Sequence, residues 1–295
     1  MNEAEFIAAL RALPLHLGAR GLLDDAAVLP FGGESLVLTH DMIAEDVHFR
    51  AEDDRADVAW KLVAVNLSDL AAKGAEPMGV LIGASLTRSA QAFVTGLHLA
   101  LSHFGAPLLG GDTIATDKNG CEVFSCTALG RATHLPVPSR AGAKPGDGLW
   151  VTGTIGDAGA GLAIARGAAG PAELLERYLR PTPRLAEGRA LAPFVHAMMD
   201  VSDGLLIDAS RMAQASGIAV EIDLALIPLS SHLSDPLAAA TAGDDYELLF
   251  AAPADFVPPI PVTRVGSFGA GIGLSLTDKG APVPLPPRLG YLHGR

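Results

Sequence analysis

Aspartates set inside apolar or glycine-rich runs are the residues of this chain whose type and spacing could do chemistry. Each lies where a strand would end or a helix would face the core, and a buried carboxylate without a partner is strongly destabilising there. The runs are LLDDAAVL, VLTHDM, AVNLSDLAA, LLGGDT, MMDVSDGLL and TAGDDYELLF, which contain Asp24, Asp25, Asp41, Asp69, Asp112, Asp200, Asp203, Asp244 and Asp245. A single aspartate of this kind is usually a helix cap or a turn former, but that interpretation does not account for so many in one chain.

A bound cation would neutralise these carboxylates. The runs themselves contain almost no Lys or Arg, and oxygen-rich sites without Cys and with few His suit Mg²⁺ best. Within one predicted helix, Leu62, Asn66 and Asp69 follow one another at helical spacing, so the amide and the carboxylate share a face. We expect that face to look into a cleft that holds several Mg²⁺ ions.

Familiar phosphate-binding motifs are missing from the sequence. It has no G-x-x-x-x-G-K-[ST], no kinase H-R-D and no D-F-G. The segment GTIGDAGAG, residues 153–161, lacks G-x-G-x-x-G spacing and is more typical of a tight turn between a strand and a helix than of a phosphate loop. Phe104 could stack on an adenine, although packing in the core is its commoner role. A nucleotide would therefore have to be bound through metal ions.

The elements that position these residues alternate between strands and helices. Helical spacing predicts helices at 5–13, 56–74, 89–103, 157–166 and 174–180, and Ser202 is expected to cap another helix that begins near Asp203. Apolar runs predict strands at 35–41, 78–86, 107–109, 121–130, 149–153, 198–201, 218–222 and 246–251. Pro, Gly and polar residues gather before residue 149, so we expect an N-terminal domain at 1–134, a linker at 135–148 and a C-terminal α/β domain at 149–295.

Composition narrows the class of protein. The 295 residues are 49% apolar and 18% charged, which predicts real hydrophobic cores, and no apolar run reaches the length of a membrane span. The formal charge of -12, without a basic stripe, argues against nucleic acid as a partner. The acidic start MNEAEFIAAL is unlike a secretory signal, so we expect a soluble, cytoplasmic protein. Cys121 and Cys126 would point to opposite faces of a strand, and we expect both to be buried free thiols.

Seven ordered motifs resemble those of one enzyme family. LLDDAAVL, LVLTHDMIAEDVHF, KLVAVNLSDLAAKGAEP, LLGGDT, SRAGAKPGD, MDVSDGL and AGDDYELLF are similar to the motif series of the thiamine-monophosphate kinases, with a fainter echo at Gly290 and Tyr291. The resemblance implies ATP-dependent phosphorylation of thiamine monophosphate to thiamine diphosphate. It also implies a two-domain α/β fold shared with aminoimidazole ribonucleotide synthetase, selenophosphate synthetase and a hydrogenase maturation protein. The N-terminal sheet domains would pair into a homodimer.

The resemblance also implies roles for individual residues. Metal ligands would be Asp25, Thr39, Asp41, Asp69, Asp112, Asp200 and Asp203, with His40 contributing through its backbone carbonyl. ATP would be contacted by Gly111, Asp112, Arg140 and Ser202, and thiamine monophosphate by His48, Asp244 and Tyr291. Asp112, Asp203 and Arg140 would be catalytic. From the residues alone, Arg140 could instead be a solvated loop residue, and His48 a packing residue at a strand end.

The sequence departs from the family pattern at five positions that bear on the site. Leu23, Asp46 and Asp244 stand where the family usually has Gly, Gly and Glu, and His40 and Lys73 stand in place of Thr and Met. Two alternatives remain open. One is another ATP-using enzyme of the same superfamily, of the purine-pathway synthetase type. The other is a non-catalytic relative that binds nucleotide or metal.

Overall fold

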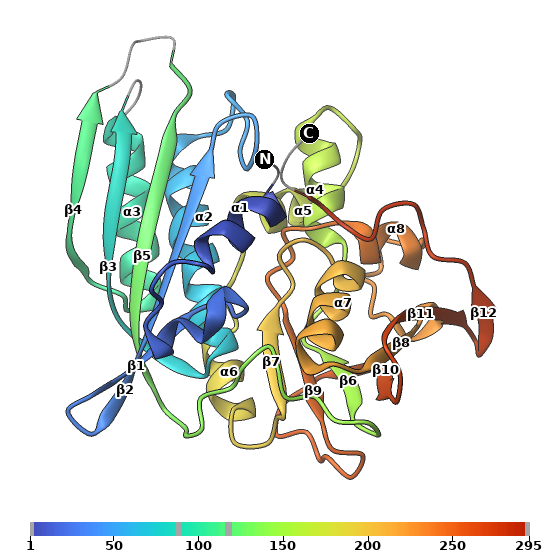
Figure 1. Cartoon of the computed structure of the whole chain (residues 1–295). Coiled ribbons are helices and arrows are strands. Elements are labelled where there is room, and N and C mark those ends of the chain that lie inside the picture. The colour runs from blue at the N-terminus through green and yellow to red at the C-terminus, as the bar shows by residue number, and fades with distance from the viewer. Residues whose placement is uncertain (1–2, 87–89, 116–119, 293–295) are drawn as a thin grey trace.

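The computed structural model of the chain describes residues 3–86, 90–115 and 120–292. Its strands form two sheets that lie side by side, with helices packed on each (Figure 1). This is the mixed helix and sheet content that the alternation predicts. In the described part of the chain, no helix is long and apolar enough to cross a membrane.

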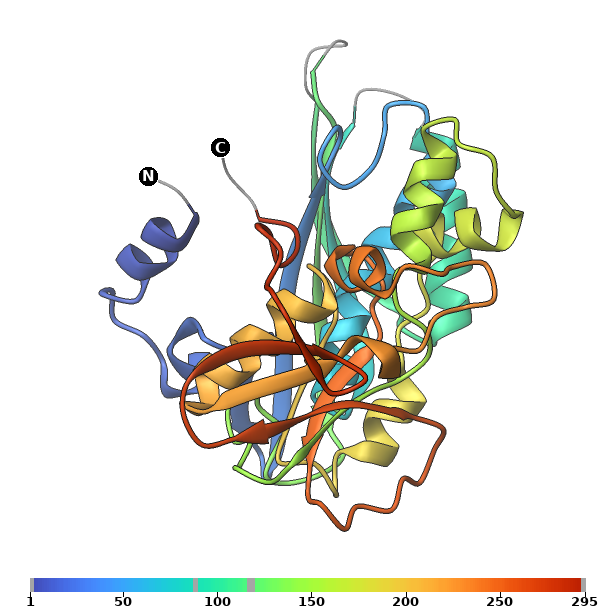
Figure 2. The same ribbon diagram turned by 90° about the vertical axis from the view of Figure 1, so that its right-hand side faces the viewer.

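The first sheet has five strands in the order β1-β2-β5-β3-β4. These are β1 (Ala27–Phe31), β2 (Glu34–Ala44), β3 (Ala75–Leu86), β4 (Leu108–Ala115) and β5 (Val123–Ala132). Paired strands are antiparallel except β3 and β4, which are parallel. Helices α2 (Arg55–Ala72) and α3 (Ala90–Phe104) lie on the same side of this sheet, which Figure 2 shows nearly edge-on. In the part of the chain that the structure describes, no comparable helix covers the other face of this sheet.

Helix α2 is the central element of the first half of the structure, which consists of the first sheet and the helices packed on it. Leu62 and Leu70 are fully buried, and the Asp54 carboxylate caps the first turn by accepting a hydrogen bond from the Ala56 N–H at 2.9 Å. Helix α3 approaches it closely because Gly96 has no side chain. A Cβ atom at Gly96 would lie 2.1 Å from the Ala56 carbonyl oxygen.

The second sheet has seven strands in the order β12-β11-β8-β10-β6-β9-β7. Its strands are β6 (Gly148–Val151), β7 (Ala197–Asp200), β8 (Ala219–Asp223), β9 (Leu248–Ala252), β10 (Thr263–Gly269), β11 (Gly273–Asp278) and β12 (Ala281–Val283). The helices of this half are α4 (Asp157–Ala165), α5 (Ala172–Leu179), α6 (Leu185–Leu191), α7 (Leu205–Ser216) and α8 (Pro236–Thr241). Helix α1 (Glu3–Leu10) and a 3₁₀ segment, η1 (Leu17–Leu22), precede β1, and η2 (Leu224–Leu226) follows β8.

Helix α6 joins the second half to the first at the C-terminal end of α2. A Cβ atom at Gly188 would lie 2.0 Å from the Ala71 carbonyl oxygen, and one at Gly74 would lie 2.5 Å from Cβ of Ala192. Both positions therefore need glycine, and Gly74 also has a positive φ of 57°. The end of α2 is thereby held against the half that carries β7.

Several elements differ from the sequence prediction. The strand predicted at 107–109 continues as β4 to Ala115, because its parallel pairing with β3 runs through Gly111 and Asp112. The helix predicted near Asp203 begins at Leu205, and the Ser202 side chain does not cap it. Ser89, where the third helix was expected to begin, lies outside the described residues. Strands β1 and β10–β12 and helices α6 and α8 were not predicted, since they are short and interrupted by Gly or Pro.

The expectation of two buried thiols is half wrong. Strand β5 begins at Val123, so Cys121 lies before it and is exposed, whereas Cys126 is buried in the core. Both cysteines are free. The division into domains at 134 and 149 stays a prediction, which the separation of the two sheets supports because the first ends at Ala132 and the second begins at Gly148.

Candidate functional site

A cavity of about 830 Å³ is lined by residues from both halves of the chain. The predicted site residues that line it are Asp25, Asp41, His48, Asp69, Arg140, Asp200, Ser202, Asp203, Asp244 and Tyr291. Thr39, His40, Gly111 and Asp112 are not among the lining residues. The structure thus brings together most of the residues that the sequence analysis singled out from separate runs.

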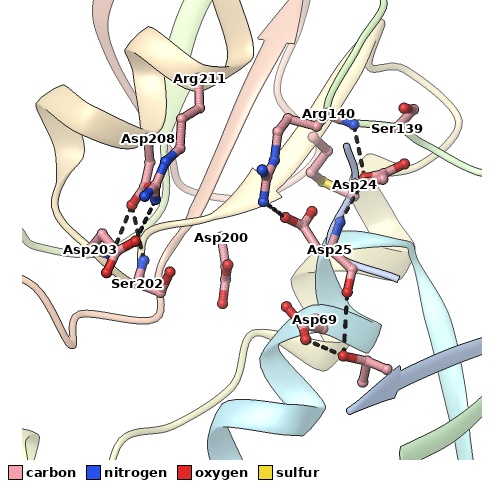
Figure 3. A network of polar contacts seen from close by, with 12 residues as sticks. Asp24, Asp25, Asp69, Ser139, Arg140, Asp200, Ser202, Asp203, Asp208 and Arg211 are labelled. Atoms are coloured by element: carbon pink, nitrogen blue, oxygen red, sulfur yellow. Dashed lines mark hydrogen bonds and ion pairs between the residues drawn. The ribbon is translucent and has the colours of Figure 1, made fainter. Parts of the chain in front are cut away.

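Three aspartates at the centre of the cavity have the arrangement of a metal site. One carboxylate oxygen from each of Asp25, Asp69 and Asp200 lies within 4.8 Å of the other two. They come from the segment before β1, from α2 and from the end of β7, and Figure 3 shows Asp200 between the groups around Arg140 and Arg211. Donors that are all carboxylate oxygens suit a hard divalent cation such as Mg²⁺.

The electrostatics of Asp69 and Asp200 favour a cation. Burial, together with the charges of Asp41, Asp200 and Asp25, raises the pKa of Asp69 well above its ordinary value. Burial and the charge of Asp25 raise the pKa of Asp200 to about 8, despite a hydrogen bond of 2.6 Å from the Ser68 hydroxyl. Among the described residues, no Lys or Arg pairs with either carboxylate. A divalent ion would replace the protons that these groups otherwise retain.

Asp24 and Asp25 differ from Asp69 and Asp200 because basic side chains contact their carboxylates. The Lys73 ammonium lies 2.5 Å from Asp24 Oδ1 and 2.6 Å from Asp25 Oδ2, Arg140 contacts Asp25, and Arg20 lies 2.5 Å from Asp24. Burial alone would raise the pKa of Asp24, but Lys73 and Arg20 hold it below its ordinary value. The expectation that these aspartates lack Lys and Arg partners is therefore wrong here, since the partners come from outside the runs.

The turn before α7 is held by a carboxylate that the sequence analysis missed. Asp208 accepts hydrogen bonds from the backbone N–H groups of Ser202, Asp203 and Gly204, at 3.0 to 3.1 Å. Arg211 contacts both Asp203 and Asp208 (Figure 3). Burial raises the pKa of Asp208 to about 6. Ser202 is thus placed on the cavity wall by Asp208, and it is not a helix cap.

Consecutive residues of strand β2 point to opposite faces of the first sheet. Thr39 and Asp41 face α2: the Thr39 hydroxyl contacts the Asp69 carboxylate, and Asp41 pairs in register with the buried Cys126. The His40 ring lies on the other face, where Nδ1 is 2.8 Å from the Thr127 hydroxyl. The imidazole of His40 is therefore directed away from the aspartates, and a role for its backbone carbonyl stays a prediction.

Gly111 and Asp112 lie on the edge strand β4. Asp112 pairs with Gly83, which pairs with Ser125, whereas Asp41 pairs with Cys126, the next residue. By strand alternation, Asp112 therefore points to the face of the sheet opposite Asp41. It is exposed, and its carboxylate accepts the Thr113 N–H at 2.9 Å. Within one chain, the structure does not bring Asp112 to the three central aspartates.

Glycine at position 111 has a packing reason of its own. A Cβ atom there would lie 1.9 Å from the Ile82 carbonyl oxygen, and φ is +157°. The close approach of β4 to β3 therefore depends on this residue. Contact with a nucleotide is not needed to explain it.

The residues predicted to touch the substrate also line the cavity. Asp244, whose φ is +69°, receives a hydrogen bond of 2.7 Å from the buried Lys61 ammonium and one of 3.0 Å from the Tyr246 hydroxyl. The His48 carbonyl accepts a second bond from Lys61 at 3.0 Å, and His48 Nδ1 accepts the Ala44 N–H at 3.1 Å. A smaller cavity of about 260 Å³ shares His48 and Asp244 with the main one.

The segment after β12 returns to the cavity. The Tyr291 N–H donates to the Asp203 carbonyl oxygen at 2.9 Å, and the Tyr291 side chain is 47% exposed. The tail is therefore attached to the turn that carries Asp203. Phe104, by contrast, packs against the core, with its ring centroid 4.9 Å from that of Trp60.

Two departures from the family pattern have a visible structural setting. Asp46 has a φ of +65°, a conformation in which glycine is common and aspartate is tolerated. Lys73 is buried at the end of α2 beside Asp24 and Asp25.

Four charged residues that contact the aspartates singled out in the sequence were missed, because they are ordinary charged residues at helical or loop positions. These are Arg20, Lys61, Asp208 and Arg211. For Asp208, the available signal was a carboxylate on the apolar face of a helix.

Two family profiles match the chain. Residues 23–132 match "AIR synthase related protein, N-terminal domain", and residues 144–258 match "AIR synthase related protein, C-terminal domain". Together they confirm the predicted two-domain α/β fold. A hydrogenase maturation protein, HypE, with a TM-score of 0.73 and 20% identity over 95% of this chain and 98% of its own, shares the fold.

Curated relatives and solved structures are more specific. The thiamine-monophosphate kinase of Caulobacter vibrioides is 41% identical over 94% of this chain and 86% of its own. That of Salmonella typhimurium is 35% identical over 92% and 91%. A solved structure described as AaThiL complexed with AMPPCP and TMP has a TM-score of 0.86 at 28% identity, covering 99% of this chain and 97% of that one. The Stenotrophomonas maltophilia thiamine-monophosphate kinase has a TM-score of 0.77 at 35% identity, covering 95% and 96%.

Proposed function

Because the chain belongs to the thiamine-monophosphate kinase family, we propose that it transfers the γ-phosphoryl group of ATP to the phosphate of thiamine monophosphate. The observation that carries this proposal is the cavity in which Asp25, Asp69 and Asp200 gather beside Arg140. The product is thiamine diphosphate. The related structure described as complexed with AMPPCP and TMP supports the binding of both a nucleotide and the acceptor.

Mg²⁺ is the cation that we propose for the central aspartates. Its protein ligands would be drawn from Asp25, Thr39, Asp41, Asp69, Asp200 and Asp203, with the His40 carbonyl. A bound Mg²⁺ supplies positive charge to the phosphate oxygens as the γ-phosphoryl group moves between two anions. The fit rests on donors that are all oxygen, and on the raised pKa values of Asp69 and Asp200, which mark carboxylates short of positive charge.

The protein's own groups would bind and orient the two phosphates. Arg140 presents a planar guanidinium at the cavity wall beside Asp25, where it can donate to an ATP phosphate. Ser202, held by Asp208, would donate from its hydroxyl. The acceptor phosphate has a second pKa of about 6 and is mostly a dianion at neutral pH, so it needs no general base. This agrees with a site built from aspartates and arginines.

Thiamine monophosphate would occupy the end of the cavity near His48, Asp244 and Tyr291. The Asp244 carboxylate is fixed by Lys61 and Tyr246, so it can accept a hydrogen bond from the aminopyrimidine without reorganising. The Tyr291 ring can cover the cationic thiazolium. The 260 Å³ cavity that shares His48 and Asp244 gives additional room at this end.

We also propose a homodimer in which the uncovered faces of the first sheets meet. That face carries exposed apolar residues, including Met78, Leu81 and Ile114. Asp112 lies on the same face, away from its own chain's cavity. A second copy would explain how Gly111 and Asp112 contribute to ATP and metal binding, because Asp112 could then serve the partner's cavity.

Mixing two inactive variants tests this arrangement. Asp112→Asn and Asp203→Asn should each abolish turnover. If Asp112 serves the partner's cavity, a mixed dimer has one complete site, and an unfolded and refolded equal mixture should recover about a quarter of wild-type activity, by random pairing. A mixture that stays inactive would place Asp112 in its own chain's site.

The activity is tested by ADP release in a coupled assay with Mg²⁺. Thiamine monophosphate should support turnover, whereas thiamine or the absence of an acceptor should not. Turnover with aminoimidazole precursors instead would assign the chain to the purine-pathway type. ATP binding without any turnover would favour a non-catalytic relative.

A further inference from the structure

The side chain of Lys73 is fully buried beside the central aspartates. Its ammonium lies 2.5 Å from Asp24 Oδ1, 2.6 Å from Asp25 Oδ2 and 3.2 Å from the Met198 carbonyl oxygen. Three acceptors match the three hydrogens of an ammonium group. Lys73 is therefore fully hydrogen-bonded without solvent, and its charge is balanced by carboxylates that line the cavity.

The position of this ammonium is fixed by the fold. Lys73 directly follows the last residue of α2 and caps its C-terminal end, where the unpaired helix carbonyls favour a cation. The next residue, Gly74, packs closely against α6 and Ala192. Met198 belongs to β7, so the same ammonium connects the segment before β1 to the second sheet. Asp24 is held further by Arg20 and by the Arg140 N–H at 3.1 Å. The surrounding fold thus holds the Lys73 ammonium in contact with Asp24, Asp25 and Met198.

Both oxygens of Asp25 are contacted by basic side chains. Lys73 contacts Oδ2, and Arg140 contacts Oδ1. A divalent ion at Asp25 would have to share this carboxylate with an ammonium that repels it. Asp69 and Asp200 are instead contacted by the hydroxyls of Thr39 and Ser68, which leave their negative charge in place.

We propose that Lys73 is a positioning residue that acts as a built-in cation of the site. It holds Asp24 and Asp25 in place and takes the position of a divalent ion on Asp25, so that divalent ions bind chiefly through Asp69 and Asp200. This inference rests on the metal site proposed above. It assigns to one lysine a role that would otherwise need an additional bound ion.

Lys73→Met tests the proposal, because methionine fills a similar volume without the charge. Mn²⁺ binding is measured in the whole protein by calorimetry and by the paramagnetic resonance signal of free Mn²⁺. The variant should bind an additional Mn²⁺, or bind Mn²⁺ about tenfold more tightly, since one adjacent positive charge is gone. Its metal-free form should unfold at a lower temperature than wild type, and Mn²⁺ should reverse much of that loss.

The double variant Lys73→Met, Asp25→Asn is the matched control. It should lose the gain in Mn²⁺ binding, because the freed carboxylate oxygen is gone. Wild type and Lys73→Met with equal stoichiometry and affinity would overturn the role of Lys73 and leave the metal site standing. Absence of Mn²⁺ binding in both proteins would overturn the metal site and this inference together.

A second comparison does not require Lys73→Met to fold. In the wild-type background, Asp69→Asn should weaken Mn²⁺ binding by about tenfold or more, and Asp25→Asn by less than about threefold. This ranking follows because Asp25 already neutralises an ammonium. Equal losses in the two variants would show that Asp25 is an ordinary ligand and would overturn the inference.

Discussion

The Asp208 carboxylate holds the backbone of Asp203 in place, because it accepts the Asp203 N–H at 3.0 Å while Arg211 contacts both side chains. Asp208→Ala should therefore lower the free energy of unfolding by about 3 kcal/mol, as expected when one partner of a buried ion pair is removed. It should also lower kcat by disordering the turn. Urea unfolding and steady-state kinetics check both effects. Asp208→Asn keeps an acceptor oxygen and should lose less, and an Asp208→Ala variant of wild-type stability would contradict this account.

The raised pKa of Asp200, about 8, predicts how the stability of the metal-free protein depends on pH. The folded protein holds a proton on Asp200 that the unfolded chain releases near pH 4. The contribution of Asp200 to the free energy of unfolding is therefore fully present at low pH, and it is lost as the pH rises towards about 8. The unfolding temperature in EDTA should fall over this range.

Asp200→Asn is the control for that pH dependence, because it cannot titrate. Its metal-free stability should change less with pH than that of wild type, and its turnover should be abolished. Mg²⁺ should stabilise wild type more at pH 8 than at pH 6, since metal binding displaces the proton. An unchanged pH profile in Asp200→Asn would assign the dependence to another group.

Replacing Asp244 should affect the two substrates differently. Asp244 lines the cavity, contacts Lys61 and Tyr246, and is proposed to bind the acceptor, so Asp244→Ala should raise the KM for thiamine monophosphate more than the KM for ATP. Asp244→Glu should be tolerated. Initial rates measured with each substrate varied in turn test this prediction. An effect on the KM for ATP alone would place Asp244 in the part of the cavity that binds the nucleotide.

The ring of Tyr291 should contribute to acceptor binding. Cation–π contact with the thiazolium predicts that Tyr291→Ala weakens thiamine monophosphate binding about tenfold, or about 1.4 kcal/mol. Tyr291→Phe keeps the ring and should retain most of the affinity. Calorimetry distinguishes the cases: an unchanged Tyr291→Ala assigns the tail to packing, and an equal loss in Tyr291→Phe indicates a hydrogen bond.

The acidic residues of the cavity could be predicted from the sequence because each of these aspartates interrupts an apolar or glycine-rich run. Asp25, Asp69 and Asp200 are far apart in sequence, yet the structure brings them within 4.8 Å. The alternation of β2 likewise separates His40 from its neighbours, which a parity argument can predict once the strand is known.

The basic partners could not be predicted in the same way. Lys73 meets Asp24 and Asp25 only because α2 ends beside the segment before β1, and Arg211, on α7, contacts Asp203 eight residues before it in the turn that precedes the helix. Neither Lys73 nor Arg211 interrupts an apolar run in the sequence, so neither draws attention as a site residue. The face on which Asp112 lies depends on the register of β4 with β3, which a single short apolar run does not determine.

The contact between α2 and α6 limits how this enzyme could open and close. Gly188 and Gly74 leave no space for even a methyl group between the two helices, so a hinge rotation at this contact would drive backbone atoms into each other. The spacing between Asp69 on α2 and Asp200 on β7 is consequently set when the chain folds. Ligand entry would then depend on the segments around the cavity, such as the tail that carries Tyr291, rather than on movement of one half against the other.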